Sequence, residues 1–482
     1  MAGSSTISQT ARGPLWWRNF GLEPKFSAGA HWDSIRVAAA RSIEAEPAPS
    51  SDKHEEWKYT SLQSIRDIEF VPVRDGRPEA VSLDRWPALS GSGPSLVFVN
   101  GVFSPALSRL SELPAGVIVS PFSECSSEDL SALGRHATFS GKLGSTNDER
   151  VVKYNSANLA DGALVRLSRG VRLDAPLSVV FVTSGAAPTV SFPRVLVLAE
   201  EDSKGTLIEA HVGDAENSLA LGVAEVELAQ RAEFTHVRFQ DESLTSRNVS
   251  SVFARQEAES NFTSIAATFG CQISRLDVNV WLAGSLTETR LDGVYVGVER
   301  QHLAHHTRID HAEPHCHSFE AYKGILDGSA TGVFNGKIFV YEDAQKTDAK
   351  QTNQALLLSP TATINTKPQL EIFADDVKCT HGATVGQLPA NAMFYLRSRG
   401  IPFVEARNLL IYAFAAEVLE RIEDQATREA LEARLYQKLA ESGHRGSPMK
   451  PTLAHSTFHL PQVPREPGRV GAAAQVQGKE GK

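Results

Sequence analysis

The amino-acid sequence predicts a mainly β protein, built around a right-handed parallel β-helix with helical regions at both ends. From Asn158 onward, strand-like apolar runs follow one another and helical periodicity is absent. Turn clusters recur about every 25–28 residues, as expected when each repeat is one coil of a solenoid. A β-propeller blade needs a longer period, of ~40 residues or more. The runs are Leu177–Val182, Val195–Leu198, Val223–Leu228, Phe234–Phe239 and Val278–Leu282; the turn clusters are Lys204-Gly205, Arg231-Ala232, Ser260-Asn261 and Gly284-Ser285.

Changes in composition and periodicity along the sequence divide the 482 residues into four expected parts. Residues 1–157 form an N-terminal helical and mixed region, and residues 158–388 form the β-helix core. Residues 389–442 form a C-terminal helical domain. Residues 443–482 are expected to be a disordered tail, because this proline- and glycine-rich segment cannot bury enough apolar surface to offset its ordering entropy.

The N-terminal region carries one clear helical pattern and an aromatic run. The Ala-rich segment from Trp32 to Glu44 predicts an amphipathic helix, because its apolar residues recur at helical spacing: Trp32, Ile35, Ala39 and Ile43. Trp57 and Tyr59 are interpreted as packing residues, since aromatic side chains dominate core energetics.

Three helices are predicted after the β-helix. The first spans Ala390 to Arg399, with Gly400 just after its end and Pro402 in the first turn of the next. The second runs to about Ile422, with Phe403, Leu410, Phe414, Val418 and Ile422 on a broad apolar face, and the third spans roughly 424–441. We expect these helices to cap the last coil, whose edge is otherwise unpaired, or to form a docking surface.

Composition restricts the classes of partner and compartment. The net charge of −9 argues against unaided binding to nucleic acid or to acidic membranes. The four cysteines, Cys125, Cys271, Cys316 and Cys379, are too few and too scattered for a disulfide framework, so free thiols in a reducing compartment are expected. Without an evident secretory signal or membrane-length apolar run, the predicted location is the cytoplasm.

The most reactive side chains of the predicted core lie near its end. Cys379 and His381 are two residues apart in a strand-like run, so they project from the same face and together suit a soft or borderline metal ion. A corner is expected at Asp375-Asp376, where the apolar phase of the run shifts. The alternative from spacing alone is that Cys379 is a small core residue and His381 caps a turn.

Residues 302–317 hold six of the fifteen histidines: His302, His305, His306, His311, His315 and His317. If 311–317 is a strand, its histidines share one face and Cys316 lies on the other. We interpret the histidines as an outward polar ladder rather than a metal site, and we expect Cys316 to pack inward. The role of this segment stays open.

Several runs resemble a known family in the same order. They are Tyr322–Leu326, Val333–Gly336, Gln345–Asp348, Leu356–Ser359, Lys367–Gly386 and Tyr395–Ile401. Together they resemble the SufB/SufD family of subunits of the SUF iron–sulfur cluster assembly complex. The Cys-Thr-His-Gly-Ala-Thr run at 379–384 resembles the SufD branch of that family.

This resemblance implies a non-catalytic scaffold with two kinds of partner. A SufB-like subunit is expected to pair side by side with the β-helix, with a homodimer as the fallback when SufB is absent. A SufC-type ATPase is expected to dock on the C-terminal helices, at Tyr395, Arg399, Phe403, Leu410 and Phe414. A transient iron–sulfur cluster is expected at the SufB interface, with His381 as ligand or near-ligand and Cys379 as supporting thiol or core residue.

No nucleotide is expected on this chain itself. The nearest approach to a Walker A motif is Gly332–Lys337, where the glycines are too close together and Ile338 replaces the Ser or Thr that would hold magnesium. Flavin dependence stays open.

Two alternatives remain from the sequence. One is a β-helix carbohydrate-active enzyme in which Asp375 and Asp376 act as the catalytic carboxylate pair. The other is a purely structural partner of SufB that supplies no ligand.

Overall fold

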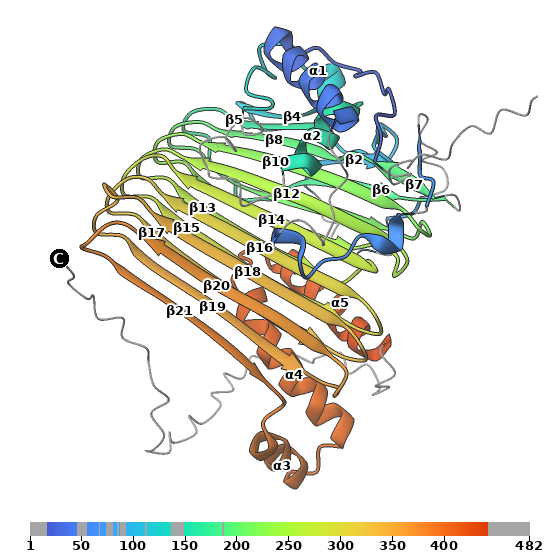
Figure 1. Cartoon of the computed structure of the whole chain (residues 1–482), viewed down its shortest axis with the longest axis vertical. Helices are drawn as coiled ribbons and strands as arrows, with labels where there is room; N and C mark the ends of the chain where they lie inside the picture. Colours follow the sequence, from blue (N-terminus) through green and yellow to red (C-terminus); the bar gives the residue numbers. More distant parts are fainter. Residues whose placement is uncertain are drawn as a thin grey trace, which may run out of the picture. The chain divides into compact units, whose positions relative to one another are not determined.

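The computed structural model describes residues 17–45, 55–66, 68–73, 81–83, 86, 93–110, 113–135, 149–185 and 188–441, which belong to one compact unit, residues 1–446. The tail expected at 443–482 lies outside the described residues. The described chain is a parallel β-solenoid with helices before and after it (Figure 1). The predicted mainly β fold with helical ends is therefore confirmed.

Two sheets form the solenoid, and from β8 onward successive strands alternate between them. Sheet A has eleven strands in the described chain: β4 Val117–Pro121, β5 Ala163–Leu167, β8 Arg194–Ala199, β10 Leu219–Leu228, β12 Arg247–Gln256, β14 Ile273–Leu282, β16 His302–His311, β18 Thr331–Val340, β20 Thr363–Ile372, with β1 Val71–Pro72 and β7 Thr189–Ser191 at its side. Sheet B has ten: β3 Val102–Phe103, β2 Ser95–Val99, β6 Leu177–Thr183, β9 Lys204–Gly213, β11 Glu233–Asp241, β13 Asn261–Thr268, β15 Glu288–Gly297, β17 His317–Leu326, β19 Asp348–Leu357 and β21 Lys378–Gly386.

Each coil contributes one strand to each sheet, and the coils stack in parallel register. From β10 onward, paired residues in sheet A lie between 26 positions apart, as in Arg247 with Ile273, and 32 positions apart, as in Thr331 with Thr363. Some coils thus match the predicted repeat of about 25–28 residues, and others are longer. Most strands of the core are ten residues long, so the turns between them account for the difference.

The core lies between the sheets because alternate residues of every strand point inward. Val278 and Val280 of β14 and Ile309 of β16 belong to the same buried cluster as Phe234 and Phe262 of sheet B. The small side chain of Cys316 is fully buried in this cluster, which confirms its predicted inward packing.

Helices bury the outer face of each sheet. On sheet A, α2 (Glu149–Asn158) packs Val151 and Tyr154 against Leu219 and Leu221 of β10. The predicted N-terminal helix is α1 (Gly29–Ala45), which contacts α2 and buries Trp32, Ala39 and Ile43. Because both faces of the central strands are covered, these strands are buried at nearly every position, as in β10 and β16.

The 3₁₀ helices η1 (Glu55–Trp57) and η2 (Gln63–Ile65) follow α1 in the chain. Trp57 is fully buried, with the Arg275 guanidinium carbon 4.1 Å from its ring centroid, so its predicted packing role is confirmed. Tyr59 is 41% exposed, so the same prediction for Tyr59 is wrong.

The C-terminal helices are α3 (Ala390–Ser398), α4 (Phe403–Leu419) and α5 (Gln425–Glu441), close to the predicted ranges. Ile411 and Val418 of α4 pack on the outer face of sheet B, in one cluster with Val294 and Ile325. Ion pairs fix this packing, including Arg407–Asp327 at 3.2 Å. The prediction that these helices cap the last coil is therefore wrong: α4 and α5 cover the side of the solenoid (Figure 1).

The two ends of the solenoid differ. At the first coils, the outermost strands β3 and β4 are antiparallel to β2 and β5 and end the parallel stack. At the other end, β20 pairs with β18 and β21 with β19, and no other strand of the described residues pairs with β20 or β21, so each presents an open edge there. Most of β21 is exposed. Among the described helices, none is long and apolar enough to cross a lipid bilayer.

Candidate functional site

The two predicted metal ligands lie on β21, the last strand of sheet B. Strand periodicity places Cys379 and His381 on its inward face, where they are in register with Ala349 and Gln351 of β19. Cys379 is half-buried and packs against the cluster that contains Ile338 and Ala349, whereas His381 is exposed. Because no later coil covers β21, the inward face of this strand opens at the end of the solenoid.

Burial determines the chemistry of the thiol. It raises the pKa of Cys379 to about 11, and the nearby Asp348 carboxylate acts in the same direction. In the free chain Cys379 is therefore a protonated thiol at neutral pH. A thiolate ligand there would need the charge of an arriving metal ion.

The corner before β21 is confirmed. Strand β20 ends at Ile372 and β21 begins at Lys378, so Asp375 and Asp376 lie in the turn between the sheets. Both aspartates are exposed, and Asp376 forms an ion pair with Lys346. The corner thus orients β21, and one member of the carboxylate pair suggested for carbohydrate chemistry has a cationic partner.

A row of polar residues in register on neighbouring strands lies next to His381 inside the solenoid. Glu320 of β17 is in register with Gln351, which is in register with His381. Glu320 Oε2 accepts hydrogen bonds from Thr307 Oγ1 at 2.8 Å and from Gln351 Nε2 at 3.1 Å. Burial raises the pKa of Glu320 to about 7. Sequence reasoning missed these residues, because the coil length that aligns them exceeds the expected repeat.

The histidine-rich segment does not form one ladder. Strand β16 ends at His311 and β17 begins at His317, so the predicted strand over 311–317 is wrong. Strand periodicity turns His305 and His311 into the core, where His311 Nε2 lies 2.9 Å from Ser318 Oγ.

On the outer face of β16, His302 and His306 are covered by residues 55–60. The ring nitrogen Nε2 of His302 lies 3.0 Å from Thr60 Oγ1, and Nδ1 of His306 lies 3.9 Å from Glu56 Oε2. Of the histidines in the predicted outward ladder, His311 is therefore buried in the core, whereas His315 and His317 are exposed. In the described part of the chain, no group of three or more His, Cys, Asp or Glu side chains is arranged to hold a metal ion.

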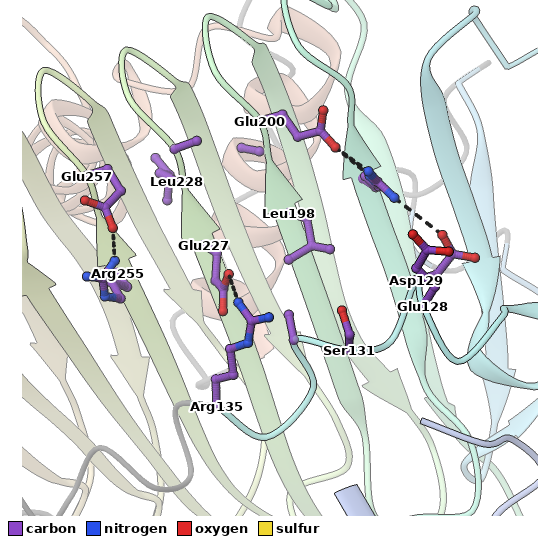
Figure 2. Close-up of a pocket in the computed structure, with 14 residues that line it drawn as sticks. Glu128, Asp129, Ser131, Arg135, Leu198, Glu200, Glu227, Leu228, Arg255 and Glu257 are labelled. Carbon is purple, nitrogen blue, oxygen red and sulfur yellow. Dashed lines mark hydrogen bonds and ion pairs between the residues drawn. The ribbon is translucent and has the colours of Figure 1, made fainter. Parts of the chain in front are cut away.

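A cavity of about 470 Å³ lies on the outer face of sheet A beside residues 128–135 (Figure 2). Its arginines pair with carboxylates of the same cavity: Arg135 with Glu227 at 3.4 Å, Arg166 with Asp129 and Glu200, and Arg255 with Glu257. None of the sequence-predicted site residues lines it. Because each of its arginines is already paired with a carboxylate, this cavity is not taken as the functional site.

The residues predicted to bind a partner lie on α3 and α4. Helix α3 has no buried residue, and Tyr395 is 50% exposed beneath the Arg399 guanidinium, whose carbon lies 5.2 Å from the ring centroid. Phe403 is also exposed, whereas Leu410 and Phe414 are half-buried. Phe394, exposed at 75%, was missed because the sequence alone did not show which face of α3 is uncovered.

Comparisons with known proteins agree with this architecture. Residues 181–414 match the family described as "SUF system FeS cluster assembly, SufBD core domain", and residues 27–179 match the "SufBD protein N-terminal region". An iron–sulfur cluster assembly SufBD family protein of Synechocystis is 32% identical over 382 residues, covering 77% of this chain and 83% of the relative.

Two bacterial proteins named iron–sulfur cluster assembly protein SufD are also similar. The Escherichia coli protein is 31% identical, covering 80% of this chain and 88% of the relative. The Bacillus subtilis protein is 26% identical, covering 83% of this chain and 92% of the relative.

Proposed function

The chain belongs to the SufBD family of iron–sulfur cluster assembly proteins, and from this premise we propose that it is a SufD-type, non-catalytic scaffold subunit. It pairs with a SufB-like subunit and docks a SufC-type ATPase. A nascent iron–sulfur cluster is the cargo, assembled where the two scaffold subunits meet. We place this assembly in the cytoplasm, since all four cysteines are free thiols, as expected in a reducing compartment.

The position of His381 and Cys379 carries this proposal. Both lie on the terminal strand of a solenoid whose last coil is uncovered. Imidazole and thiolate are both suitable iron ligands, and histidine replaces cysteine in some iron–sulfur centres. Two side chains cannot complete a cluster site, so the remaining ligands come from the partner. His381 ranks above Cys379 because it is exposed, whereas the thiol is half-buried and protonated.

The unpaired edges of β20 and β21 support the SufB-like partner. The Lys378 N–H bonds to Thr347 of the preceding coil, so the alternation of a parallel ladder directs the N–H groups of Cys379, His381 and Ala383 to the open edge. Pro368 fits the same pattern in β20, because proline is tolerated where the missing N–H faces outward. A related β-helix could extend both sheets across this edge.

The exposed aromatic side chains of α3 and α4 support the ATPase partner. Phe394, Tyr395 and Phe403 are each at least half exposed. Helix α4 is held on sheet B by the Lys323–Glu417 ion pair, and Arg421, just after the helix, pairs with Asp292. Phe403 therefore lies on a helix that is anchored to the solenoid. Exposed apolar clusters of this kind mark interaction surfaces.

The test is His381→Ala in the complex co-expressed with its SufB-like and SufC-like partners. We expect normal assembly of the complex and loss of iron and sulfide incorporation. Thr380→Ala is the matched control, because Thr380 is exposed on the opposite face of the same strand. Undiminished incorporation in His381→Ala would reject the ligand role and leave a purely structural partner.

A further inference from the structure

The side chain of Gln351 is held in a defined orientation directly behind His381. Its Nε2 donates to Glu320 Oε2 at 3.1 Å, so the amide must turn its carbonyl oxygen elsewhere. That oxygen, Oε1, is buried and has no hydrogen-bond partner among the described residues. An unpaired buried acceptor is costly, with a typical penalty of about 1–3 kcal/mol.

Gly336 of β18 makes room for this amide. A Cβ added at Gly336 would lie 2.2 Å from Gln351 Nε2 and 2.7 Å from Gln351 Cδ. Gly336 therefore has a steric role here: its missing side chain is the space that the Gln351 amide occupies.

The register places Gln351, which carries the unpaired oxygen, beside His381. Gln351 and His381 are direct neighbours on parallel strands and share the inward face. Neighbouring strands are about 4.8 Å apart, so a side chain on one reaches the adjacent residue on the other. Because His381 is exposed, rotation about its side-chain bonds is free to bring a ring nitrogen to this acceptor.

We propose that Gln351 is a positioning residue for His381: its carbonyl oxygen accepts one ring N–H of His381 and so leaves the other ring nitrogen free to bind iron. The inference rests on the proposed ligand role of His381. A ligating histidine usually donates its second ring N–H to an oxygen acceptor, which fixes the tautomer and the ring orientation. Glu320 and Gly336 act one step further back, by holding the amide of Gln351.

The first test measures the tautomer of His381 in the full chain labelled with ¹⁵N-histidine, using His381→Ala to assign the resonances. We expect one dominant tautomer in the wild type. Gln351→Leu and Gly336→Ala should both shift the ratio towards that of free imidazole. Gly336→Ala displaces the Gln351 amide and also crowds Phe334 Cζ, 2.9 Å from the added Cβ, but it keeps all polar groups. It therefore provides a second variant in case Gln351→Leu has a folding defect.

Gln354→Leu is the matched control, because Gln354 lies on the same strand and strand alternation turns it outward. It should leave the His381 resonances unchanged, with thermal unfolding followed for every variant. Identical His381 resonances in the wild type and Gln351→Leu would overturn the proposal.

The second test measures anaerobic binding of Fe(II) alone to the co-expressed complex. We expect Gln351→Leu and Gly336→Ala to weaken the His381-dependent affinity by roughly 10- to 100-fold, as for other residues that orient a metal ligand. A tautomer change with no loss of Fe(II) affinity would overturn the positioning role in metal binding. If His381→Ala itself leaves the affinity unchanged, the proposed ligand role fails, and the tautomer measurement still decides the contact with Gln351.

Discussion

At the residue scale, the core of this solenoid holds an unusual set of buried imidazoles. His305 lies between two tyrosine rings, with centroid distances of 4.9 Å to Tyr295 and 5.5 Å to Tyr322. Both of its ring nitrogens are buried without a hydrogen-bond partner among the described residues. Burial lowers the pKa of His305 to about 3, and the charge of Arg238 adds to this effect.

We predict that His305→Phe makes the protein less sensitive to acid. The folded-state pKa of His305 lies below the ordinary value of 6.5, so between pH 6.5 and 3 the unfolded chain binds a proton that the folded protein does not bind. The unfolding free energy is therefore highest above pH 6.5 and decreases as the pH falls towards 3. At pH 5, keeping this imidazole neutral in the folded state lowers the unfolding free energy by about 2 kcal/mol relative to its value above pH 6.5. Phenylalanine keeps the ring contacts, so the variant should gain about that much relative to the wild type between pH 7.5 and pH 5.

Thermal or urea unfolding at the two pH values measures this difference. His317→Phe provides the control, because His317 is an exposed histidine at the start of β17. Equal pH dependence in His305→Phe and the wild type would contradict the prediction.

At the element scale, α3 differs from the other C-terminal helices because it buries nothing. Helices α4 and α5 contribute Ile411, Val418, Leu431 and Leu435 to the cluster on sheet B, whereas α3 has no buried residue. A nine-residue helix is marginal in water by itself, so packing against a partner is a natural source of its stability.

We predict that Phe394→Glu and Tyr395→Glu weaken docking of the SufC-type ATPase while the chain stays folded. Substitutions at exposed positions typically change stability by about 0.5 kcal/mol or less, so thermal unfolding should be nearly unaffected. Loss of an exposed aromatic anchor at an interface typically costs about 2 kcal/mol of binding free energy or more. Co-elution with the ATPase in size-exclusion chromatography measures the effect.

Val37→Glu is the control for this experiment. Val37 is 44% exposed on α1, which packs over sheet A and not beside α3. Unchanged co-elution of Phe394→Glu and Tyr395→Glu would place the ATPase interface elsewhere.

At the scale of the whole solenoid, one end is closed by antiparallel pairs and the other end is open. Two unpaired sheet edges present backbone N–H and C=O groups that can pair with another chain. In the proposed function, a related scaffold subunit occupies these edges, and a second copy of this chain is the fallback because related subunits present similar surfaces.

We predict that Ala383→Pro weakens the pairing with a SufB-like subunit. The Ala383 N–H points to the open edge, so proline there removes a donor from the edge without breaking a bond to β19. Ala383→Val keeps the N–H and should pair normally. Mass measurement by light scattering on the co-expressed subunits distinguishes heterodimer, homodimer and monomer.

Two results would contradict this account. One is normal heterodimer formation by Ala383→Pro. The other is a persistent homodimer of the wild-type chain when the SufB-like subunit is present.

The sequence by itself determined the features that local patterns encode. Recurrent turns predicted coils, the corner at Asp375-Asp376 followed from the shift in apolar phase, and Gly400, with φ of +85°, ends α3 as its position suggested. The runs between Tyr322 and Ile401 were together enough to indicate the family that the comparisons then showed.

Only the tertiary structure decided which surfaces are covered and which side chains meet. Alternation along a strand separates its two faces, but it does not identify the core face when helices bury the outer one as well, as in β10 and β16. For that reason His311 was expected outside, although it lies in the core. The alignment of Glu320, Gln351 and His381 on neighbouring strands depends on coil lengths of 30–31 residues. A local pattern cannot fix that register, because turns of variable length set which residues become neighbours.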